Sequence, residues 1–202
     1  MKTIKLVKNC FPLREIYSLI PLLLFNLIST AQTSNLSYGT GALRLDQNNN
    51  MMNPGDFNTA IGINTLYNNT SGGWNTATGM NALFNNINGN FNTANGMSAL
   101  FKNTSGSYNT AIGMNALVAN TTGDSSIAIG VNALFTNTTG YNNIANGVLS
   151  LYLNKDGHDN IAMGYLSLYS NASGFNNVAI GSGALQNNTV SGNIAIGYQS
   201  LF

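Results

Sequence analysis

Hydrophobic and polar positions recur along this 202-residue chain with a period of seventeen residues. Copies of the pattern begin at Asn58, Asn75, Asn92, Asn109, Ser126, Asn143, Asn160, Asn177 and Asn193, and only the last step is sixteen residues long. The best-kept copy reads N-T-A-I-G-M-N-A-L-V-A-N-T-T-G, from Asn109 to Gly123. Self-similarity at a fixed period of this kind is typical of a solenoid, in which each repeat stacks on its neighbours and cannot bury a core alone.

Four positions of the repeat keep the same residue in every copy. The third is Ala, the fifth is Gly, the ninth is Leu, and the twelfth is Asn in the eight copies that reach it. An alanine in every coil predicts a narrow core. The glycine follows a short apolar run and predicts a turn with positive φ or a close backbone approach. The twelfth-position Asn predicts a corner of each coil, where stacked side chains could form an amide ladder.

Each copy is predicted to form β structure rather than helix. Frequent Gly, Asn, Ser and Thr residues cannot sustain an apolar stripe of helical period. The small residue at the eighth position, followed by the constant Leu, is interpreted as a second short strand. The pattern therefore predicts an all-β solenoid of about nine coils, with two strands of about four to five residues in each coil.

Two neighbouring positions change together halfway along the repeats. In the first four copies, an aromatic residue precedes the copy and Thr is its second residue; the aromatic residues are Phe57, Trp74, Phe91 and Tyr108. From the fifth copy on, the preceding residue is polar and the second residue is Ile or Val. Residues two apart lie on one face of a strand, so each coil is predicted to keep one large apolar group there. The change predicts a junction between two sub-blocks at Asp124–Ser125.

The segments that flank the regular array have a different character. Residues 1–31 carry a basic start, an apolar run and small residues before Gln32, which is typical of a secretory signal peptide. Residues 32–56 are interpreted as a lead-in with a capping coil, because residues 38–43 imitate the middle of a repeat. The repeat domain covers residues 57–202. The sequence stops in mid-coil, so we expect the array to continue in a longer protein.

Loss of the signal peptide changes the composition of the chain. Cys10 is removed, and the mature chain has no cysteine. Three basic and five acidic residues remain, a net charge of −2. A nucleic-acid-binding protein needs a basic patch, so nucleic acid is not an expected partner. Without disulfides, a secreted chain of this size depends on regular stacking or oligomerisation for its stability.

Candidate catalytic chemistry is sparse. His158 is the only histidine, and with Asp156 and Asp159 it could hold a metal ion. The three residues occupy a corner where other copies carry N-T-S-G or N-T-T-G, so a polar turn is the preferred interpretation. Neither a serine triad nor a phosphate-binding loop is indicated. The sequence therefore predicts no catalytic, cofactor-binding or metal-binding residues and a protein that is not an enzyme.

Two further features allow more than one interpretation. The Asn-X-Ser/Thr tripeptides that begin at the corner residues Asn69, Asn103, Asn120, Asn137 and Asn171 match glycosylation sites, but turn chemistry accounts for them without sugar. Aromatic residues often follow the constant Leu: Tyr67, Phe84, Phe101, Phe135, Tyr152 and Tyr169. Their rings are predicted to point away from the core, where they form an intermolecular interface or a binding surface. Burial in an oligomer is favoured.

The motif A-I-G-x-x-A, seen at residues 60–62, 111–116, 128–133 and 195–197, resembles the head repeat of YadA-like trimeric autotransporter adhesins. The resemblance covers essentially residues 57–202, although the repeat of that family is shorter. It implies a left-handed parallel β-roll, assembly as a homotrimer with aliphatic side chains between the chains, and a secreted location at the bacterial cell surface or outer membrane. No direct membrane insertion is expected for this segment.

The expected function is that of an adhesin-like head module without catalytic activity, which binds a host or extracellular-matrix protein or a glycan. The alternative is a structural spacer of a surface or tail-fibre-like protein whose functional domain lies C-terminal to this chain. Ice binding by a flat threonine array is disfavoured, because the second-position Thr gives way to Ile or Val halfway along the chain.

Overall fold

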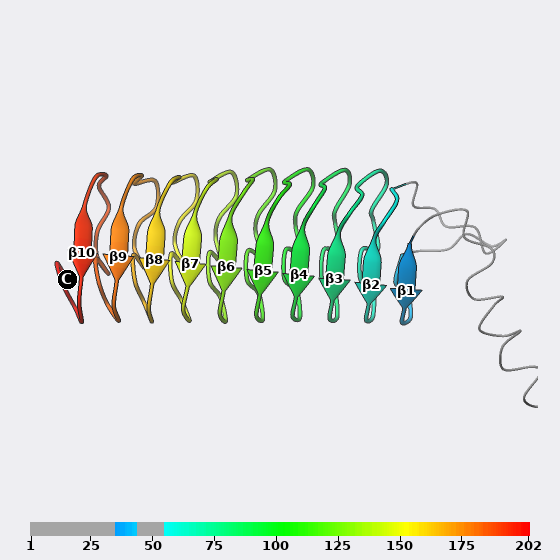
Figure 1. The fold of residues 1–202 in the computed structure, drawn as a ribbon, viewed down its shortest axis with the longest axis horizontal. Coiled ribbons are helices and arrows are strands. Elements are labelled where there is room, and N and C mark those ends of the chain that lie inside the picture. Colours follow the sequence, from blue (N-terminus) through cyan, green and yellow to red (C-terminus); the bar gives the residue numbers. More distant parts are fainter. Residues whose placement is uncertain (1–34, 44–54) are drawn as a thin grey trace, which may run out of the picture. The chain divides into compact units, whose positions relative to one another are not determined.

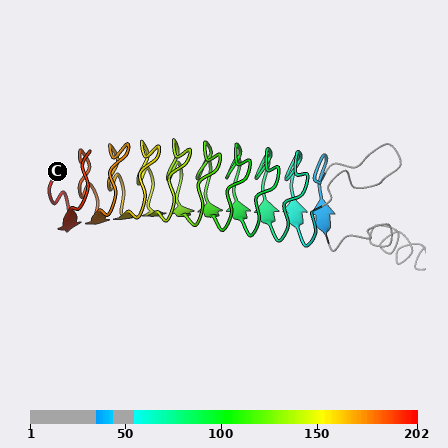
Figure 2. The same cartoon turned by 90° about the horizontal axis from the view of Figure 1, so that it is seen from above.

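The computed structural model describes residues 35–43 and 55–202, which form a parallel β-solenoid (Figures 1 and 2). Ten strands make one sheet: β1 (Leu36–Tyr38), β2 (Thr59–Ile61), β3 (Thr76–Thr78), β4 (Thr93–Asn95), β5 (Thr110–Ile112), β6 (Ile127–Ile129), β7 (Ile144–Asn146), β8 (Ile161–Met163), β9 (Val178–Ile180) and β10 (Ile194–Ile196). The strand order in the sheet follows the chain. Each turn of the solenoid therefore adds one strand, and the predicted all-β solenoid of seventeen-residue coils is confirmed. The predicted signal peptide lies outside the described residues.

Strand pairing places equal positions of successive copies side by side. In the pairing of β2 with β3, Thr59 lies beside Thr76 and Ala60 beside Ala77. The same seventeen-residue step joins β5 to β6, across the sequence junction, so the sheet continues through it. The sixteen-residue step between β9 and β10 still pairs Ala179 with Ala195. The missing residue must therefore be absorbed outside the sheet.

Residues 35–43 form the first described coil. β1 pairs with β2 and places Ser37 beside Ala60, the position that holds Ala in all later coils. Gly39 has the positive φ of the repeat glycine, and Leu43 is fully buried like the repeat leucine. The Asn35 side chain accepts a hydrogen bond from the backbone N–H of Asn58 at 2.6 Å. Part of the lead-in segment thus follows the pattern of the repeats.

The predicted second strand of each coil does not form. The small residue and the leucine lie in turns, and the leucine has a left-handed backbone, with φ of 51° at Leu66 and at Leu117. The residue two places earlier is also left-handed, as at Asn115. Such residues curl the chain around the core rather than extend it. The prediction was wrong because the pattern of a small residue followed by a constant leucine does not reveal whether φ is positive or negative.

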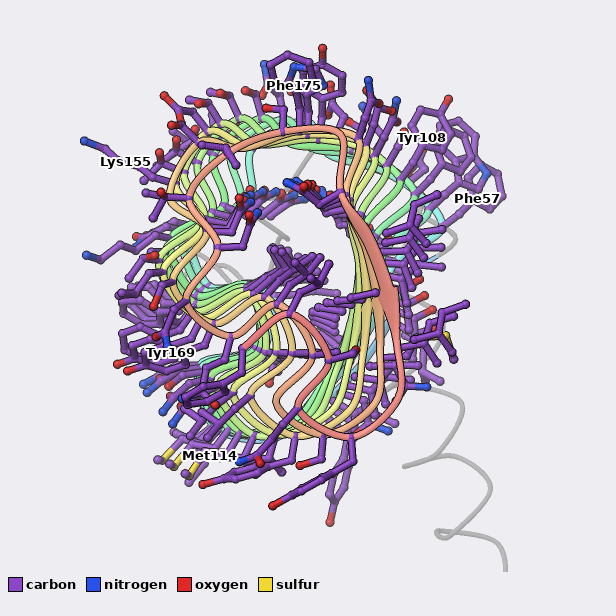
Figure 3. All side chains as sticks on the ribbon, turned by 90° about the vertical axis from the view of Figure 1, so that its left-hand side faces the viewer. Phe57, Tyr108, Met114, Lys155, Tyr169 and Phe175 are labelled. Atoms are coloured by element: carbon purple, nitrogen blue, oxygen red, sulfur yellow. The ribbon has the colours of Figure 1, made fainter. Side chains whose placement is uncertain are left out.

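The core is a narrow column of alanine and leucine side chains. The third-position alanines are buried, and so are the ninth-position leucines of every copy except the last, where Leu201 is exposed. The small residues at the eighth position are also buried in most coils. Seen along the solenoid axis, these side chains fill the space between the sheet and the turns (Figure 3). Neighbouring coils are also joined by backbone hydrogen bonds outside the sheet, for example from Leu66 N–H to Ala82 O at 3.0 Å. The narrow core that the constant alanine predicted is confirmed.

The twelfth-position asparagines form the predicted amide ladder. The Asn120 side chain donates to Oδ1 of Asn103 and accepts from Asn137, both at 2.8 Å. Nδ2 of the same residue also donates to the carbonyl of Gly123, at the end of its own corner. The ladder runs without a break through Asn69, Asn86, Asn103, Asn120, Asn137, Asn154 and Asn171, all of them buried. From Asn69 to Asn154, each of these amides is therefore bonded to a neighbouring coil through its Oδ1 atom.

A second ladder of side chains starts from the first position of each copy, which the sequence analysis had treated only as the start of the repeat. Oδ1 of Asn92 accepts from the backbone N–H of Asn109 at 3.0 Å, and Nδ2 of Asn109 donates to the carbonyl of Gly123 at 2.8 Å. Two buried amides, Asn109 and Asn120, thus converge on one carbonyl oxygen. Ser126 interrupts this arrangement, because only Asn137 is left to donate a side-chain hydrogen bond to Gly140.

The sixteen-residue coil loses its residue at the asparagine corner. Nδ2 of Asn188 donates to Val190 O, two residues on, where other corners use a glycine three residues on. Asn188 therefore does not extend the ladder, and Oδ1 of Asn171 is the one buried side-chain polar atom without a partner among the described residues. The shortened corner ends the predicted amide ladder at Asn171.

Substitution of the repeat glycine will test the close approach of neighbouring coils. Gly113 has φ of 131°, and a Cβ built on it would lie 2.6 Å from the carbonyl oxygen of Gly130. Gly197 has φ of 127°, but nothing lies within 4 Å of a Cβ there. We expect Gly113→Ala to lower the free energy of unfolding in urea well beyond Gly197→Ala, which carries only backbone strain of about 1–3 kcal/mol. Equal losses in the two variants would contradict close coil contact as the reason for glycine.

The interrupted first-position ladder predicts a stabilising substitution. Ser126→Asn restores a side-chain donor for Gly140 O, and we expect it to raise the free energy of unfolding by about 0.5–1.5 kcal/mol. The matched variant Asn109→Ser removes the equivalent bond to Gly123 and is expected to lower it. Urea unfolding followed by circular dichroism measures both. A neutral or destabilising Ser126→Asn would show that the ladder does not limit stability there.

Candidate functional site: ladders of aromatic side chains

Aromatic side chains stack in rows along the solenoid. The first ladder consists of Phe57, Trp74, Phe91 and Tyr108, whose ring centroids are 5.0–5.2 Å apart. These residues precede successive copies of the repeat, and their side chains are 44–62% exposed. Figure 3 shows Phe57 and Tyr108 on the same outer corner of the solenoid, beside the strands. The sequence pattern identified these residues, but it placed them in the strand, which begins two residues later.

The backbone holds the first ladder in a conformation that aromatic residues seldom adopt. φ is 57° at Trp74 and at Phe91. A left-handed backbone is uncommon for bulky residues, so the surrounding structure must compensate its cost. The backbone N–H of each of these residues donates to the preceding coil, as from Phe91 to Gly73 O at 3.1 Å. Coil-to-coil hydrogen bonds therefore fix the spacing at which the rings stack.

The second ladder is the row that follows the constant leucine. Its rings stack in two runs, Tyr67–Phe84–Phe101 and Phe135–Tyr152–Tyr169, with centroids 5.0–5.2 Å apart. These rings are half-buried rather than fully outward-facing. Val118 takes the place of a ring between the two runs. The predicted row exists, and its rings cover one another along the axis.

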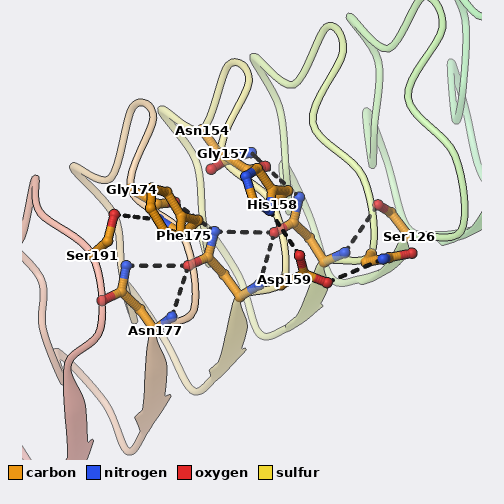
Figure 4. A network of polar contacts seen from close by, with 12 residues as sticks. Ser126, Asn154, Gly157, His158, Asp159, Gly174, Phe175, Asn177 and Ser191 are labelled. Carbon is orange, nitrogen blue, oxygen red and sulfur yellow. Dashed lines mark hydrogen bonds and ion pairs between the residues drawn. The ribbon is translucent and has the colours of Figure 1, made fainter.

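The third ladder contains the only histidine. His158 stacks between Tyr141 and Phe175, with ring centroids 4.7 and 5.0 Å away. Its Nδ1 lies 2.7 Å from Oδ2 of Asp159, and Oδ1 of Asp159 accepts from Asn142 in the preceding coil at 3.0 Å (Figure 4). Within the described part of the chain, no group of three or more His, Cys, Asp or Glu side chains could hold a metal ion. Stacking on its neighbours gives His158 a role that the sequence analysis did not identify.

The polar contacts of Asp159 lower its pKa. The main cause is the hydrogen bond with the His158 side chain, followed by the hydrogen bond from Asn142. Both contacts favour the ionised carboxylate. Asp159 is solvent-exposed, so these contacts act in a screened setting and give only a modest local effect.

All three ladders are interrupted in the coil at residues 109–125. The first ladder ends at Tyr108, the second is broken by Val118, and the third begins only at Tyr141. In this coil, Asp124 stands where the next coil carries Tyr141, and Ser125 stands where the preceding coil carries Tyr108. The junction expected at Asp124–Ser125 is therefore a change in the side-chain ladders, while the sheet runs through it.

The outer face of the sheet has a more polar half and a more apolar half, because the first strand residue is Thr in β2 to β5 and Ile or Val in β6 to β10. The strand residues on either side of the buried alanine are partly or fully exposed. In β3 and β4 they are Thr and Asn. In β6, β9 and β10 they are Ile or Val. The apolar half of this face begins where the first ladder ends.

The glycosylation-like asparagines are part of the interior. Asn69, Asn103, Asn120, Asn137 and Asn171 are at most 3% exposed. Their amide nitrogens donate to a glycine carbonyl of the same corner. The structure therefore supports the interpretation of these tripeptides as turn chemistry.

Comparisons with models of protein families, with curated proteins and with solved structures found no match. Across residues 35–43 and 55–202 there is also no apolar helix of a length that would span a membrane. The surface features of the described residues are three aromatic ladders and the more apolar half of the sheet, all held at the regular spacing of the coils.

Removal of the Asp159 charge will test the polar contacts of the third ladder. A carboxylate whose folded pKa lies below its ordinary value of 3.8 stabilises the fold above that value, and the contribution is lost as the pH falls through the folded pKa. Asp159→Asn is expected to lower the melting temperature at pH 6, and its melting temperature should approach that of the wild type as the pH falls below 3.8.

The matched control for this experiment is Asp156→Asn, which removes an exposed carboxylate from the same coil. Its melting temperature is expected to follow that of the wild type across the pH range. A loss of equal size in both variants would assign the effect to overall charge instead of to the contacts with His158 and Asn142.

Proposed function

We propose that this chain is an extracellular, non-catalytic binding module that presents its first aromatic ladder and the adjoining sheet face to another macromolecule. The observation that carries the proposal is the exposure of Phe57, Trp74, Phe91 and Tyr108 in register on a rigid scaffold. Soluble proteins seldom expose contiguous apolar surface unless it contacts a partner. Aromatic residues are also enriched where binding energy concentrates in interfaces.

The stacking geometry favours a protein surface over a glycan as the contact. Interplanar angles within the first ladder are 7–17°, so each inner ring has both faces covered by its neighbours. A sugar ring packs on an open aromatic face, and here only the two ends of the ladder offer one. The exposed ring edges carry partial positive charge and suit the carbonyl groups and aromatic faces of a protein partner.

The resemblance to YadA-like adhesin heads supports two finer points of the proposal. It favours a homotrimer, in which the half-buried second ladder or the apolar half of the sheet lies between chains, and a place on the bacterial surface. The structural-spacer alternative is favoured by a different observation. Backbone hydrogen bonds join neighbouring coils at several points of each turn, which makes the array stiff enough to hold another domain at a distance.

Binding measurements on a ladder variant will test the proposal. The variant Trp74→Asn/Phe91→Asn removes the two inner rings of the first ladder. Later coils already carry asparagine at this position, as Asn142 and Asn176, so the fold should tolerate the change. We expect the wild-type protein, labelled at its N-terminus, to bind immobilised extracellular-matrix proteins and the variant to lose at least about 1.4 kcal/mol, a factor of ten in affinity.

The control variant is Tyr67→Gln, which takes the residue found at Gln186 in the second ladder and leaves the first ladder intact. Equal binding by the wild type and the first-ladder variant would sink the proposed surface. Light scattering on the same preparations gives the assembly state: a trimer supports the adhesin-head interpretation, and a monomer contradicts it. A trimer that binds neither matrix proteins nor glycans would favour the spacer.

A further inference from the structure

A column of methionine side chains lies on the surface just beyond the sheet. Met80, Met97 and Met114 occupy the sixth position of three successive coils, directly after the repeat glycine. Their side chains are 40–44% exposed. Figure 3 shows sulfur atoms gathered at the outer edge of the solenoid beside Met114.

The backbone fixes the three methionines in register. The carbonyl of each accepts a hydrogen bond from the next coil: Ser98 N–H to Met80 O at 2.9 Å, Asn115 N–H to Met97 O at 3.0 Å, and Asn132 N–H to Met114 O at 3.0 Å. Stacked coils repeat at about 4.8 Å, the spacing of neighbouring strands. Two thioether sulfurs on neighbouring coils are therefore close enough for one ion to bridge them after small changes of rotamer, and methionine has three rotatable bonds for this.

Packing does not require methionine at this position. The same column holds Ile63 before the methionines and Val131 and Val148 after them, so the solenoid accepts branched aliphatic residues there. The column also lies outside the core of alanine and leucine. Three consecutive exposed thioethers thus add a chemical property, soft metal binding, that their aliphatic neighbours lack.

We propose that Met80, Met97 and Met114 form a surface site for a soft monovalent metal ion, Cu(I). Thioether sulfur is a soft ligand that selects Cu(I) over harder ions such as Mg²⁺ or Ca²⁺. The residues that flank the methionines in the sequence are neutral: Thr78 and Asn95 in the strands, and Asn81, Ser98 and Asn115 at the following position. The site therefore offers no carboxylate or imidazole to a competing divalent ion. Met97 has a methionine on each side and is expected to bind in either pair.

Titration with Ag(I), a redox-stable ion of the same charge and softness, tests the site. The purified protein carries ¹³C-labelled methionine methyl groups, so each thioether reports on binding separately. We expect the methyl signals of Met80, Met97 and Met114 to shift together as Ag(I) is added, while the signal of Met163, an isolated strand residue, stays in place. Cu(I) affinity is then measured by competition with a chromophoric chelator.

Isoleucine is chosen for the substitutions because Ile63 already occupies the same column. Met80→Ile/Met97→Ile/Met114→Ile should keep the circular dichroism spectrum of the wild type and weaken Cu(I) binding by about tenfold or more. Met97→Ile alone should weaken binding more than Met80→Ile, and Met163→Ile should leave it unchanged. The site is overturned if the column signals do not shift, or if the folded triple variant binds Cu(I) as tightly as the wild type.

Discussion

The buried asparagine amide is the group on which the rest of this structure depends. The apolar core is narrow and consists mainly of alanine and leucine side chains. The same interior also holds two asparagine side chains in most coils. A buried amide without partners is costly, so every one of them must find donors and acceptors nearby. These partners belong largely to the neighbouring coils, as in the Asn103–Asn120–Asn137 run. One coil therefore cannot be satisfied alone, and the seventeen-residue register is set by amide geometry as much as by apolar contact.

The same dependence explains how residues 35–43 and 55–202, which contain no cysteine and few charged side chains, can be ordered. The stability of a stack of this kind is the sum of two contributions: the weak intrinsic stability of each coil and the strong interactions between neighbouring coils. Here the interactions between neighbouring coils are the strand pairs, the turn hydrogen bonds, the amide ladders and the ring stacks. The aromatic ladders have a particular place among them. Trp74 and Phe91 have an unfavourable φ, and stacking on both sides helps to offset its cost.

The constant residues predicted the architecture well. Ala60 and its equivalents gave the narrow core, Gly113 and its equivalents the close backbone approach, and Asn120 and its equivalents the amide ladder. The prediction of a second strand failed because the sign of φ at Leu117 is not encoded by its hydrophobicity. The partners of Asn109 and the stacking of His158 were missed for another reason. Both depend on side chains of the neighbouring coils, seventeen residues away in the sequence. Neither position keeps one residue in every copy, so identity between copies does not point to them.

The coil at residues 109–125 shows which of the interactions between neighbouring coils can vary. Strand pairing and the twelfth-position amide ladder pass through it unchanged. The aromatic ladders stop there, and the first-position ladder weakens one residue later at Ser126. The backbone and the interior thus form one continuous stack, while the outer surface consists of two blocks with different side chains. A surface that changes over a constant interior shows that the fold constrains the inner positions more tightly than the outer ones. This separation is why the fold follows from the repeat, whereas the function must be sought in the residues that differ between its copies.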